Sequence, residues 1–288
     1  MIRTKNEGEF IGETLRRIEE QNFSGNYEII VVDSGSSDAT IDIVRNHKVK
    51  LVEMPEKEFT YGRSLNIGAS NAEGTFVVNL SAHALPVDRE WLGSLIAGFE
   101  NNKVAGTYGR QITDGRMNPF EARRNECFFG ASKAKFNMTG VKRSGQPRFS
   151  NSNSSIKKEM WERFRFNEEV DWAEDMVWQR EVMQAGFSIV YTPDAAVHHT
   201  HPVNIPNAFK TSKDCAVTLA LMEHKRKSAC MAVYDIAAFL ALIPGSVFQD
   251  VKYIWQNDYR QYLGIAPLYT LSALAGWLVG RVRYRFSR

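Results

Sequence analysis

The sequence of 288 residues is poor in cysteine and in net charge, and both shortages exclude classes of protein. Its three cysteines, Cys127, Cys215 and Cys230, are far apart and form no CxxC pair. This spacing argues against a disulfide framework or a cysteine zinc site and fits a reducing compartment. The net charge is only +3 and no basic-aromatic groove motif accompanies it, so nucleic acid is not an expected partner. The N-terminus carries no secretory signal, and we expect a cytoplasmic location.

The first 112 residues alternate short apolar strands with helices but lack a dinucleotide-binding fingerprint. We predict strands at 1–4, 27–33, 49–53, 74–80 and 103–109, with helices at 8–21, 37–47, 61–72 and 88–101. Short strands joined by helices imply right-handed crossovers and a doubly wound, mostly parallel α/β sheet. The turn after the first strand is Thr4-Lys5-Asn6-Glu7 instead of GxGxxG, which disfavours a dehydrogenase.

The remainder of the chain changes character twice. Residues 113–150 are rich in Arg, Lys, Asn, Gly and Ser, which predicts a long flexible loop that closes over a ligand or holds an acceptor. Residues 151–201 return to an α/β pattern, and from about 205 the pattern is helical. We therefore predict one α/β domain over 1–204 and a helical region over 205–288.

The helical region contains an apolar segment, 262–280, without a charged residue. It approaches the ~20 residues that cross a bilayer, although Pro267 and three glycines shorten its helix. Four arginines and several aromatic residues lie at its end, a pattern typical of a helix lying on the cytoplasmic face of a membrane. The segment 230–248 adds to the same surface. A true membrane span and simple packing within the protein are the alternatives. The four arginines are Arg281, Arg283, Arg285 and Arg288.

The run from Glu28 to Thr40 places an acid where ligands bind in open α/β sheets. Four β-branched residues lead directly into Asp33, as in a parallel strand buried on both faces, and a small-residue loop follows. The carboxyl edge of such a sheet is the usual ligand site. Ser36, Ser37 or Asp38 would cap the next helix, whose amides suit a phosphate-bearing ligand. An ordinary strand–turn–helix with a capping aspartate is the alternative.

Two further side chains fall at the same predicted edge. Arg63 opens the helix after the third strand, and His83 follows the fourth strand. The arginine would pair with phosphate oxygens or form a surface salt bridge. The histidine would bind a divalent cation or a phosphate, or serve only for capping and packing.

An acidic pair follows a tryptophan. Glu174 stands three residues after Asp171, which is capping-box spacing and gives Glu174 a structural explanation. Asp175 has a weaker one, because any acid in the first turn suits the helix dipole. The dipole would lower the pKa of Asp175 and weaken it as a base. Trp172 and Trp178 would desolvate this carboxylate and raise its pKa again. A carboxylate whose pKa is set by these two opposing effects can accept a proton from an attacking alcohol.

Three of the six histidines, His198, His199 and His201, cluster within four positions. In an extended strand His199 and His201 point to the same side, which indicates a metal or phosphate site. An exposed polar strand end is the alternative.

Taken together, these segments resemble family 2 of the inverting nucleotide-sugar glycosyltransferases, which have the GT-A fold, and within it the rhamnosyltransferase-like subgroup. The resemblance covers roughly residues 1–201. It rests on Thr4-Lys5-Asn6-Glu7, Val32-Asp33-Ser34-Gly35-Ser36-Ser37-Asp38-Ala39-Thr40, Gly62-Arg63-Ser64-Leu65-Asn66, Leu80-Ser81-Ala82-His83-Ala84-Leu85-Pro86, Trp91-Leu92, Ala173-Glu174-Asp175 and His199-Thr200-His201.

The resemblance implies a donor site at the first strand ends. Asp33 would hydrogen-bond the base of the donor, and Thr4 and Glu7 would line the nucleoside pocket. Arg63 would lie near the base or the diphosphate. The strand pattern alone predicts only that a ligand binds at this edge of the sheet. The resemblance adds that the ligand is a nucleotide.

The resemblance also implies a catalytic pair. Glu174 and Asp175 match the acidic pair of the family, with Asp175 as the base, and Trp172 would contact the acceptor. His201, with His199 as the other candidate, matches the downstream metal- or phosphate-binding position.

The family usually has Asp-x-Asp where this chain has Ser81, Ala82 and His83. Without the two carboxylates, an oxygen-only Mg²⁺ site is disfavoured. His83 and His201 would favour Mn²⁺. Alternatively, no metal is needed and the imidazoles themselves steady the departing diphosphate.

The implied function is inverting transfer of a sugar from a nucleoside-diphosphate sugar to a hydroxyl of a lipid-linked or other glycan acceptor in cell-surface polysaccharide synthesis. The enzyme would lie peripherally on the inner face of the cell membrane, and a homo-oligomer is left open. One alternative is a metallohydrolase that uses His83, Asp175, His199 and His201. The other is a non-catalytic nucleotide-sugar-binding membrane protein.

Overall fold

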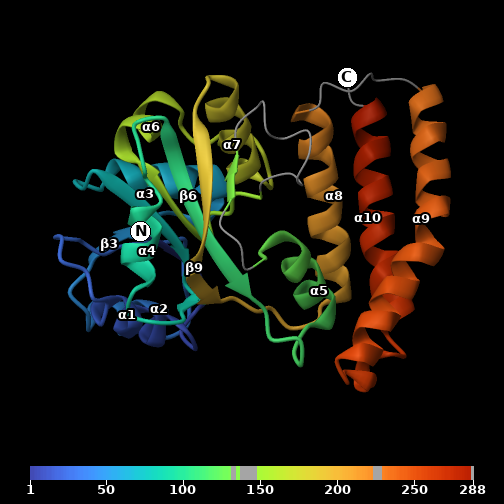
Figure 1. The fold of residues 1–288 in the computed structure, drawn as a ribbon, viewed down its shortest axis with the longest axis horizontal. Helices are drawn as coiled ribbons and strands as arrows, with labels where there is room; N and C mark the ends of the chain where they lie inside the picture. Colours follow the sequence, from blue (N-terminus) through green and yellow to red (C-terminus); the bar gives the residue numbers. More distant parts are fainter. Residues whose placement is uncertain (131–133, 137–147, 223–228, 287–288) are drawn as a thin grey trace. The chain divides into compact units, whose positions relative to one another are not determined.

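The computed structural model describes residues 1–130, 134–136, 148–222 and 229–286, and these form two compact units (Figure 1). The first unit takes most of the α/β segment, and the second takes the C-terminal helices with two short internal segments. The sequence pattern does not predict that these internal segments join the helices. The first unit is Met1–Thr113, Asn125–Glu169 and Glu174–Thr200, and the second is Asp114–Arg124, Val170–Ala173 and His201–Arg288.

The first unit is built on one mostly parallel sheet. In the described residues its strand order is β3-β2-β1-β4-β8-β6-β9-β5, with β7 paired to β9. The first four strands run parallel, as do β6 and β9, whereas β8, β5 and β7 pair antiparallel. The strands are β1 (Ile2–Thr4), β2 (Ile30–Asp33), β3 (Lys50–Glu53), β4 (Phe76–Ser81), β5 (Leu85–Pro86), β6 (Val104–Ile112), β7 (Ala134–Phe136), β8 (Asn153–Lys157) and β9 (Ser188–His198).

Helices cover both faces of this sheet, so the predicted doubly wound fold is confirmed. The alternation of strand side chains separates two cores: Val31 faces one, and Ile30 and Val32 face the other. The first face is covered by α1 (Ile11–Glu19), α2 (Thr40–Arg45) and α4 (Trp91–Ala97). The second is covered by α3 (Tyr61–Ser70), α6 (Lys158–Arg163) and α7 (Glu174–Gln184).

A helix, α5 (Pro119–Phe128), occupies part of the segment predicted as a flexible loop. Asn118 caps it, because its Oδ1 accepts a hydrogen bond from the backbone N–H of Glu121 at 3.1 Å. Pro119 then occupies the first helical position, where a missing N–H costs nothing. The loop prediction is therefore wrong for 119–128, since the composition obscured an Asn-Pro start signal. Residues 131–133 and 137–147 lie outside the described part.

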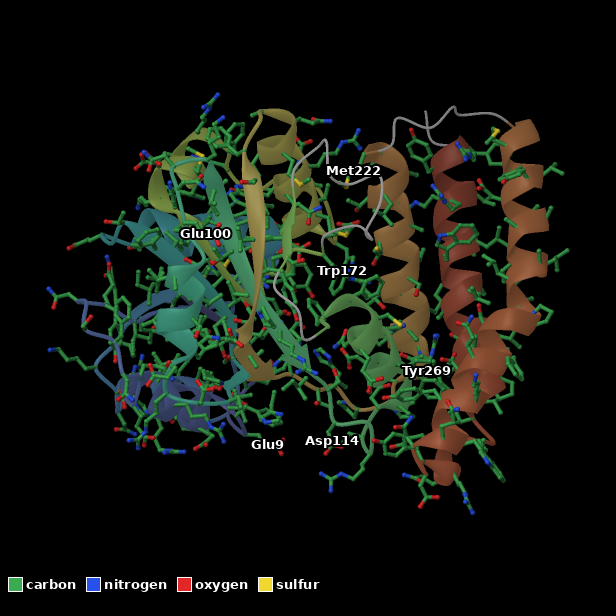
Figure 2. The ribbon with its side chains drawn as sticks, in the orientation of Figure 1. Glu9, Glu100, Asp114, Trp172, Met222 and Tyr269 are labelled. Atoms are coloured by element: carbon green, nitrogen blue, oxygen red, sulfur yellow. The ribbon has the colours of Figure 1, made fainter. Side chains whose placement is uncertain are left out.

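The second unit packs its long helices closely. These are α8 (Ile205–Met222), α9 (Ala229–Gln256) and α10 (Ala266–Phe286). A Cβ added at Gly276 would lie 2.2 Å from the carbonyl oxygen of Phe209, and one at Gly280 would lie 2.2 Å from that of Lys213. Both glycines thus let α10 approach α8. Tyr269 of α10 is buried as well (Figure 2). The apolar character of 262–280 is therefore largely used in packing.

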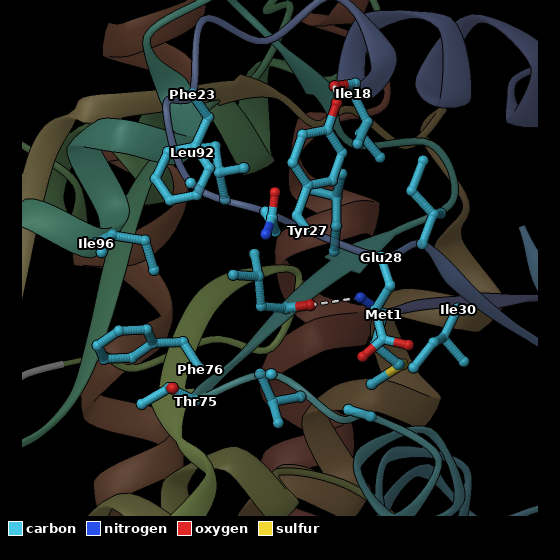
Figure 3. A pocket seen from close by; sticks show the side chains of 18 of the residues that line it. Met1, Ile18, Phe23, Tyr27, Glu28, Ile30, Thr75, Phe76, Leu92 and Ile96 are labelled. Atoms are coloured by element: carbon cyan, nitrogen blue, oxygen red, sulfur yellow. Dashed lines mark hydrogen bonds between the residues drawn. The ribbon is translucent and has the colours of Figure 1, made fainter. Parts of the chain in front are cut away.

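A pocket of about 550 Å³ opens at the amino ends of β2 and β4 (Figure 3). Its lining is mostly apolar and includes Tyr27 and Phe76. The α-amino group of Met1 donates a hydrogen bond to the carbonyl oxygen of Val78 at 2.7 Å there, and burial lowers its pKa to about 5. Because Asp33 ends its strand at the opposite edge, this pocket is not the predicted donor site.

Candidate functional site

Two loops at the carboxyl edge of the sheet are held together by hydrogen bonds. Asn6 Oδ1 accepts from the backbone N–H of Ser37 at 2.8 Å, and the Asn6 N–H donates to Ser36 Oγ at 2.8 Å. The Glu7 N–H donates to Thr40 Oγ1 at 2.8 Å. Asn6 adopts a left-handed φ of 54°, which asparagine tolerates better than most residues. The edge that follows β1 and β2 is therefore preorganised.

Asp33 is buried at the end of β2, with only 1% of its surface exposed. Its Oδ2 accepts hydrogen bonds from the N–H groups of Gly35 and Ser36, each at 2.9 Å, and its Oδ1 accepts one from Ser36 Oγ. Gly35 has a φ of +89°, which only glycine adopts readily. A carboxylate offers about four acceptor positions, so little capacity is left for a ligand. The loop-ordering role is present, and contact with a nucleobase stays a prediction.

The predicted cap of α2 is wrong. Ala39 occupies the N-cap position and makes no side-chain cap, because Asp38 lies one residue too early. Asp38 instead accepts hydrogen bonds from the N–H groups of Thr40 and Gly8, each at 3.0 Å, and from the Thr40 hydroxyl. These bonds, led by the hydroxyl, lower the pKa of Asp38. Its carboxylate ties the two loops together.

Thr4 ends β1 beside Asp33 and is 4% exposed. Among the described residues, its Oγ1 is one of the few buried side-chain atoms without a hydrogen-bond partner. Burying an unpaired hydroxyl costs about 1–3 kcal/mol, so such a group calls for an explanation. Its position is the one that the sequence predicts for the nucleoside pocket.

Four side chains at the carboxyl ends of β1, β4, β6 and β9 form a chain of close polar contacts. Glu7 Oε1 lies 2.8 Å from His83 Nδ1, and His83 Nε2 lies 3.1 Å from His199 Nε2. His199 Nδ1 lies 2.8 Å from Gln111 Oε1. The two imidazole rings stack with centroids 4.9 Å apart. The structure thus brings together two of the predicted histidines and gives each a partner on its far nitrogen.

These contacts favour a proton on Nδ1 of both histidine rings. A carboxylate only accepts, so His83 Nδ1 carries a proton, and the amide oxygen of Gln111 requires the same of His199 Nδ1. Two neutral rings would then aim their Nε2 lone pairs at each other. A proton shared between the rings or a cation bound to both relieves this repulsion. Two imidazoles on one ion at a right angle, with bonds of about 2.1 Å, have nitrogens about 3.0 Å apart, so the separation suits a cation.

His201 follows two residues later and is assigned to the second unit. Its Nδ1 lies 3.0 Å from Oε1 of Glu121, which belongs to the same unit. The prediction that His199 and His201 alternate within a strand is wrong, because β9 ends at His198. Two residues of chain span at most about 7 Å, so His201 remains near His199 by connectivity.

The acidic pair lies at the start of α7. Asp175 Oδ1 accepts from the N–H of Met176 at 2.7 Å, and Oδ2 accepts from the N–H of Asn151 at 3.4 Å. Burial, and then the negative charge of Glu174, raise the pKa of Asp175 to about 7. The lowering of the pKa expected from the helix dipole is therefore outweighed by the rise that desolvation causes. A carboxylate with this pKa is poised to exchange a proton near neutral pH.

Glu174 is the first residue of α7, so the predicted capping box with Asp171 is wrong. The chain enters the helix through Ala173, whose φ of 66° is left-handed and unusual for alanine. Glu174 is 5% exposed, with Asn151 Nδ2 at 3.3 Å and Arg3 Nη1 at 4.0 Å. A strained entry and a buried ion pair thus position the pair, as is common at functional sites.

Four residues that support the site have no place in the sequence predictions: Arg3, Asn79, Gln111 and Asn151. Asn79 Nδ2 donates to Asn151 Oδ1 at 3.2 Å, and so supports the residue that contacts both members of the acidic pair. A signal did exist, because Asn79 interrupts an apolar strand and is fully buried. A polar residue at a buried strand position requires a partner, but the sequence does not identify it.

The Gly62–Asn66 motif is used mostly in packing. A Cβ at Gly62 would lie 2.0 Å from the carbonyl oxygen of Asn167. Asn66 Oδ1 accepts from Trp161 Nε1 at 2.9 Å and holds the segment that precedes α7. Arg63 Nη2 lies 2.6 Å from Glu58 Oε2, which is the salt bridge foreseen as the alternative. Contact of Arg63 with phosphate stays a prediction.

The remaining predicted residues have structural partners. The carbonyl oxygen of Ser81 accepts from the N–H of Ala84 at 3.0 Å, a turn that presents His83. The carbonyl oxygen of buried Ala82 accepts from Thr14 Oγ1. In the second unit, the Trp172 carbonyl oxygen accepts from Thr218 Oγ1 at 2.8 Å. The acceptor contact of Trp172 stays a prediction.

Known proteins show similarity in both sequence and fold. The O-antigen chain rhamnosyltransferase RfbN of Salmonella typhimurium is 26% identical over 225 residues, covering 75% of this chain and 70% of that protein. The O-antigen chain rhamnosyltransferase WbaN of Salmonella anatum is 27% identical over 194 residues, covering 66% of this chain and 62% of that protein.

Solved structures share the fold at low identity. The mannosyltransferase PcManGT from Pyrobaculum calidifontis, in complex with GDP-Man and Mn²⁺, superposes with a TM-score of 0.61 at 20% identity, covering 95% of this chain and 84% of that chain. S. aureus TarS 1-349 in complex with UDP gives 0.56 at 16% identity, covering 99% and 90%. The model of Glycosyl transferase family 2 matches residues 1–164, more than half of the sequence. The predicted resemblance is confirmed: this chain belongs to Glycosyl transferase family 2.

Proposed function

We propose that this glycosyltransferase moves a deoxyhexose, with rhamnose the first candidate, from a nucleoside-diphosphate sugar to a hydroxyl of a lipid-linked glycan. Both Salmonella relatives are named as rhamnosyltransferases of O-antigen chains. Two neighbours in fold hold GDP-Man or UDP. These names support a nucleotide-sugar donor and a role in cell-surface polysaccharide synthesis. The inner face of the membrane is the proposed location.

Asp175 carries the proposed reaction. Its carboxylate accepts the proton of the acceptor hydroxyl while the hydroxyl oxygen bonds to the anomeric carbon of the sugar. The bond from that carbon to the diphosphate breaks in the same step, so the configuration inverts and a nucleoside diphosphate leaves. The observation that supports this role is the raised pKa of about 7, which comes from burial beside Glu174. A base near neutral pKa is effective at cellular pH.

Asn151 and Arg3 keep this base in place. The Asn151 N–H fixes one oxygen of Asp175, and its side-chain amide contacts Glu174. Arg3 offsets the charge of Glu174 at 4.0 Å. The charge of Glu174 in turn helps to raise the pKa of Asp175.

The His83–His199 pair fits a divalent cation. The Nε2 atoms lie 3.1 Å apart, and Glu7 holds one ring from behind, as carboxylates do for metal-binding histidines. His201, two residues after His199, is the proposed third ligand. A bound cation would offset the charge of the departing diphosphate, and imidazole ligands favour Mn²⁺ over Mg²⁺. Without a cation, an imidazolium shared by the pair would supply positive charge to the same group.

The nucleoside is proposed to lie over the ends of β1 and β2. Thr4 Oγ1 offers a buried hydroxyl there, and the three hydrogen bonds that Asp33 accepts leave about one acceptor position on its carboxylate. Arg63 is near enough to the surface to exchange Glu58 for a phosphate oxygen, since 43% of its side chain is exposed.

The test combines binding and turnover on the full chain. Thermal shifts with UDP, GDP and dTDP, and with their sugars, should identify the donor, and adding Mn²⁺ should enlarge the shift. Asp175→Asn should lower kcat by about 10²–10⁴-fold and leave the donor-induced shift in place. Unchanged transfer by this variant would refute the assignment. Sugar release to water without an acceptor would indicate a hydrolase, and donor binding without turnover would indicate a non-catalytic protein.

A further inference from the structure

Helix α9 presents a stripe of exposed apolar side chains along one side. Successive members are three, four, eight and seven residues apart, which keeps them on one face of a helix with 3.6 residues per turn. They are Val233, Ile236, Leu240, Phe248 and Trp255, with exposures of 66, 44, 59, 67 and 59%. We call these five residues the α9 stripe.

The helix that carries the stripe is unusually apolar and poorly covered. Among the described residues, only its segment Met231–Gln256 is long and apolar enough to cross a membrane, with a mean hydropathy of 1.8 and 11% of the window buried. Its 28 residues extend about 42 Å. Exposed apolar surface on this scale marks an interaction site.

Both acids of α9 point into the second unit, away from the stripe. Asp235 is 3% exposed, and its Oδ2 accepts from Arg285 Nε at 2.9 Å. Asp250 is 5% exposed and accepts from Arg123 Nε and from Thr270 Oγ1, each at 2.6 Å. A true span would have to break or bury these pairs in lipid, so α9 remains part of the unit and offers only its stripe.

Positive charge lies along the chain at both ends of the stripe. Lys225, Arg226 and Lys227 precede α9 in the sequence. Arg260 follows it, and its guanidinium stacks over the Trp255 ring at 4.9 Å. Cations beside an apolar helix face match the anionic lipids of the cytoplasmic leaflet.

We propose that the α9 stripe inserts into the interface of an anionic membrane and that α9 lies parallel to the bilayer. This inference rests on the proposed function, because a lipid-linked acceptor holds the substrate at that surface. It also revises the sequence prediction, which assigned membrane contact first to 262–280. Gly276 and Tyr284 of α10 are buried, and Arg285 of the predicted basic tail is paired inside the unit.

The experiment measures binding of the full chain to vesicles of phosphatidylcholine alone or mixed with phosphatidylglycerol. The stripe variant carries Val233→Ser, Leu240→Ser and Phe248→Ser. The control variant carries Leu221→Ser, Leu268→Ser and Val279→Ser, three residues of α8 and α10 with comparable exposures of 47, 58 and 43%.

We expect the wild type and the control to bind the anionic vesicles. The stripe variant should lose more than about a hundredfold in partition coefficient, because each methylene in lipid strengthens binding about fourfold. Binding to phosphatidylcholine alone should be weaker, by about fivefold for each basic residue near the surface. Circular dichroism and transfer to a water-soluble acceptor should be the same for all three proteins.

Three outcomes would overturn the proposal. The first is that the wild type fails to bind vesicles. The second is that the control variant loses binding while the stripe variant keeps it. The third is that light scattering shows the α9 stripe buried in a dimer instead. Failure of transfer to the soluble acceptor, with vesicle binding intact, would contradict the proposed function and leave the membrane surface standing.

Discussion

Replacing Asp175 by asparagine should stop sugar transfer and also stabilise the protein above neutral pH. The structure raises the pKa of this carboxyl to about 7, first by burial and then by the charge of Glu174. The folded chain therefore disfavours the ionised carboxylate that the reaction requires. The amide of asparagine has the same shape but no charge. It therefore removes the free-energy cost of ionising a buried carboxyl, and it also removes the base.

The magnitude follows from the difference in pKa between the two states. In the unfolded chain an aspartate has a pKa of about 3.9, so between about pH 4 and 7 the native state binds more protons and its stability falls as pH rises. Three pKa units correspond to roughly 4 kcal/mol. Asparagine keeps only part of the hydrogen bonds from Asn151 and Met176, which subtracts about 1–3 kcal/mol. The net gain above neutral pH should be roughly 1–3 kcal/mol.

The assay is chemical denaturation of both proteins at about pH 5 and pH 8. The advantage of Asp175→Asn should grow by roughly 2–3 kcal/mol between these values, because hydrogen bonds lost at both pH values cancel in the comparison. In the wild type, kcat should rise tenfold per pH unit below about pH 7 and level off above it. Asp171→Asn is the matched control, since Asp171 is exposed and three residues upstream of Glu174. A stability difference that does not change with pH, or an asparagine variant that retains transfer, would refute the reasoning.

Three further substitutions test the site and the packing, and two of them are paired with a control substitution at another glycine. Glu7→Gln removes the carboxylate behind His83 and should raise the Mn²⁺ concentration for half-maximal activity by about 10–100-fold, as measured by metal titration. Gly62→Ala forces a methyl group onto a backbone carbonyl and should cost about 3 kcal/mol in urea unfolding. Gly93→Ala, with no atom within 4 Å, should instead stabilise by about 0.5–1 kcal/mol. In α10, Gly276→Ala should also cost about 3 kcal/mol, whereas Gly245→Ala, in open space, should not destabilise. Equal effects within either glycine pair would contradict the packing described.

Local patterns were sufficient to predict the fold. A buried parallel strand is visible as a run of β-branched residues, and Ile30–Asp33 is such a run. The crossover helices follow from apolar spacing, as in α1, which buries Ile11, Leu15 and Ile18. Helix starts were less reliable, because they depend on a single side chain. Asp38 lies one position away from a cap, and Asn118 caps a helix inside a segment whose composition indicated a loop.

The sequence predicted candidate residues for the site but not the side chains that contact them. His83 and His199 are 116 positions apart, and nothing in either segment identifies Gln111 as a partner. The packing role of Gly62 likewise depends on a backbone carbonyl at Asn167. Such partners are set by tertiary contacts, which short sequence patterns do not encode.

The replacement of two expected carboxylates by Ser81 and His83 has a physical consequence for the cation. Glu7 still brings a negative charge to this edge of the sheet, but its carboxylate contacts His83 Nδ1 at 2.8 Å and acts through the imidazole. The ring presents a neutral nitrogen polarised by the carboxylate behind it, in place of an anionic oxygen. A site of this kind attracts a hard ion such as Mg²⁺ weakly and accepts Mn²⁺ more readily. The carboxylate would therefore act on the proposed cation through the imidazole of His83 instead of binding it directly.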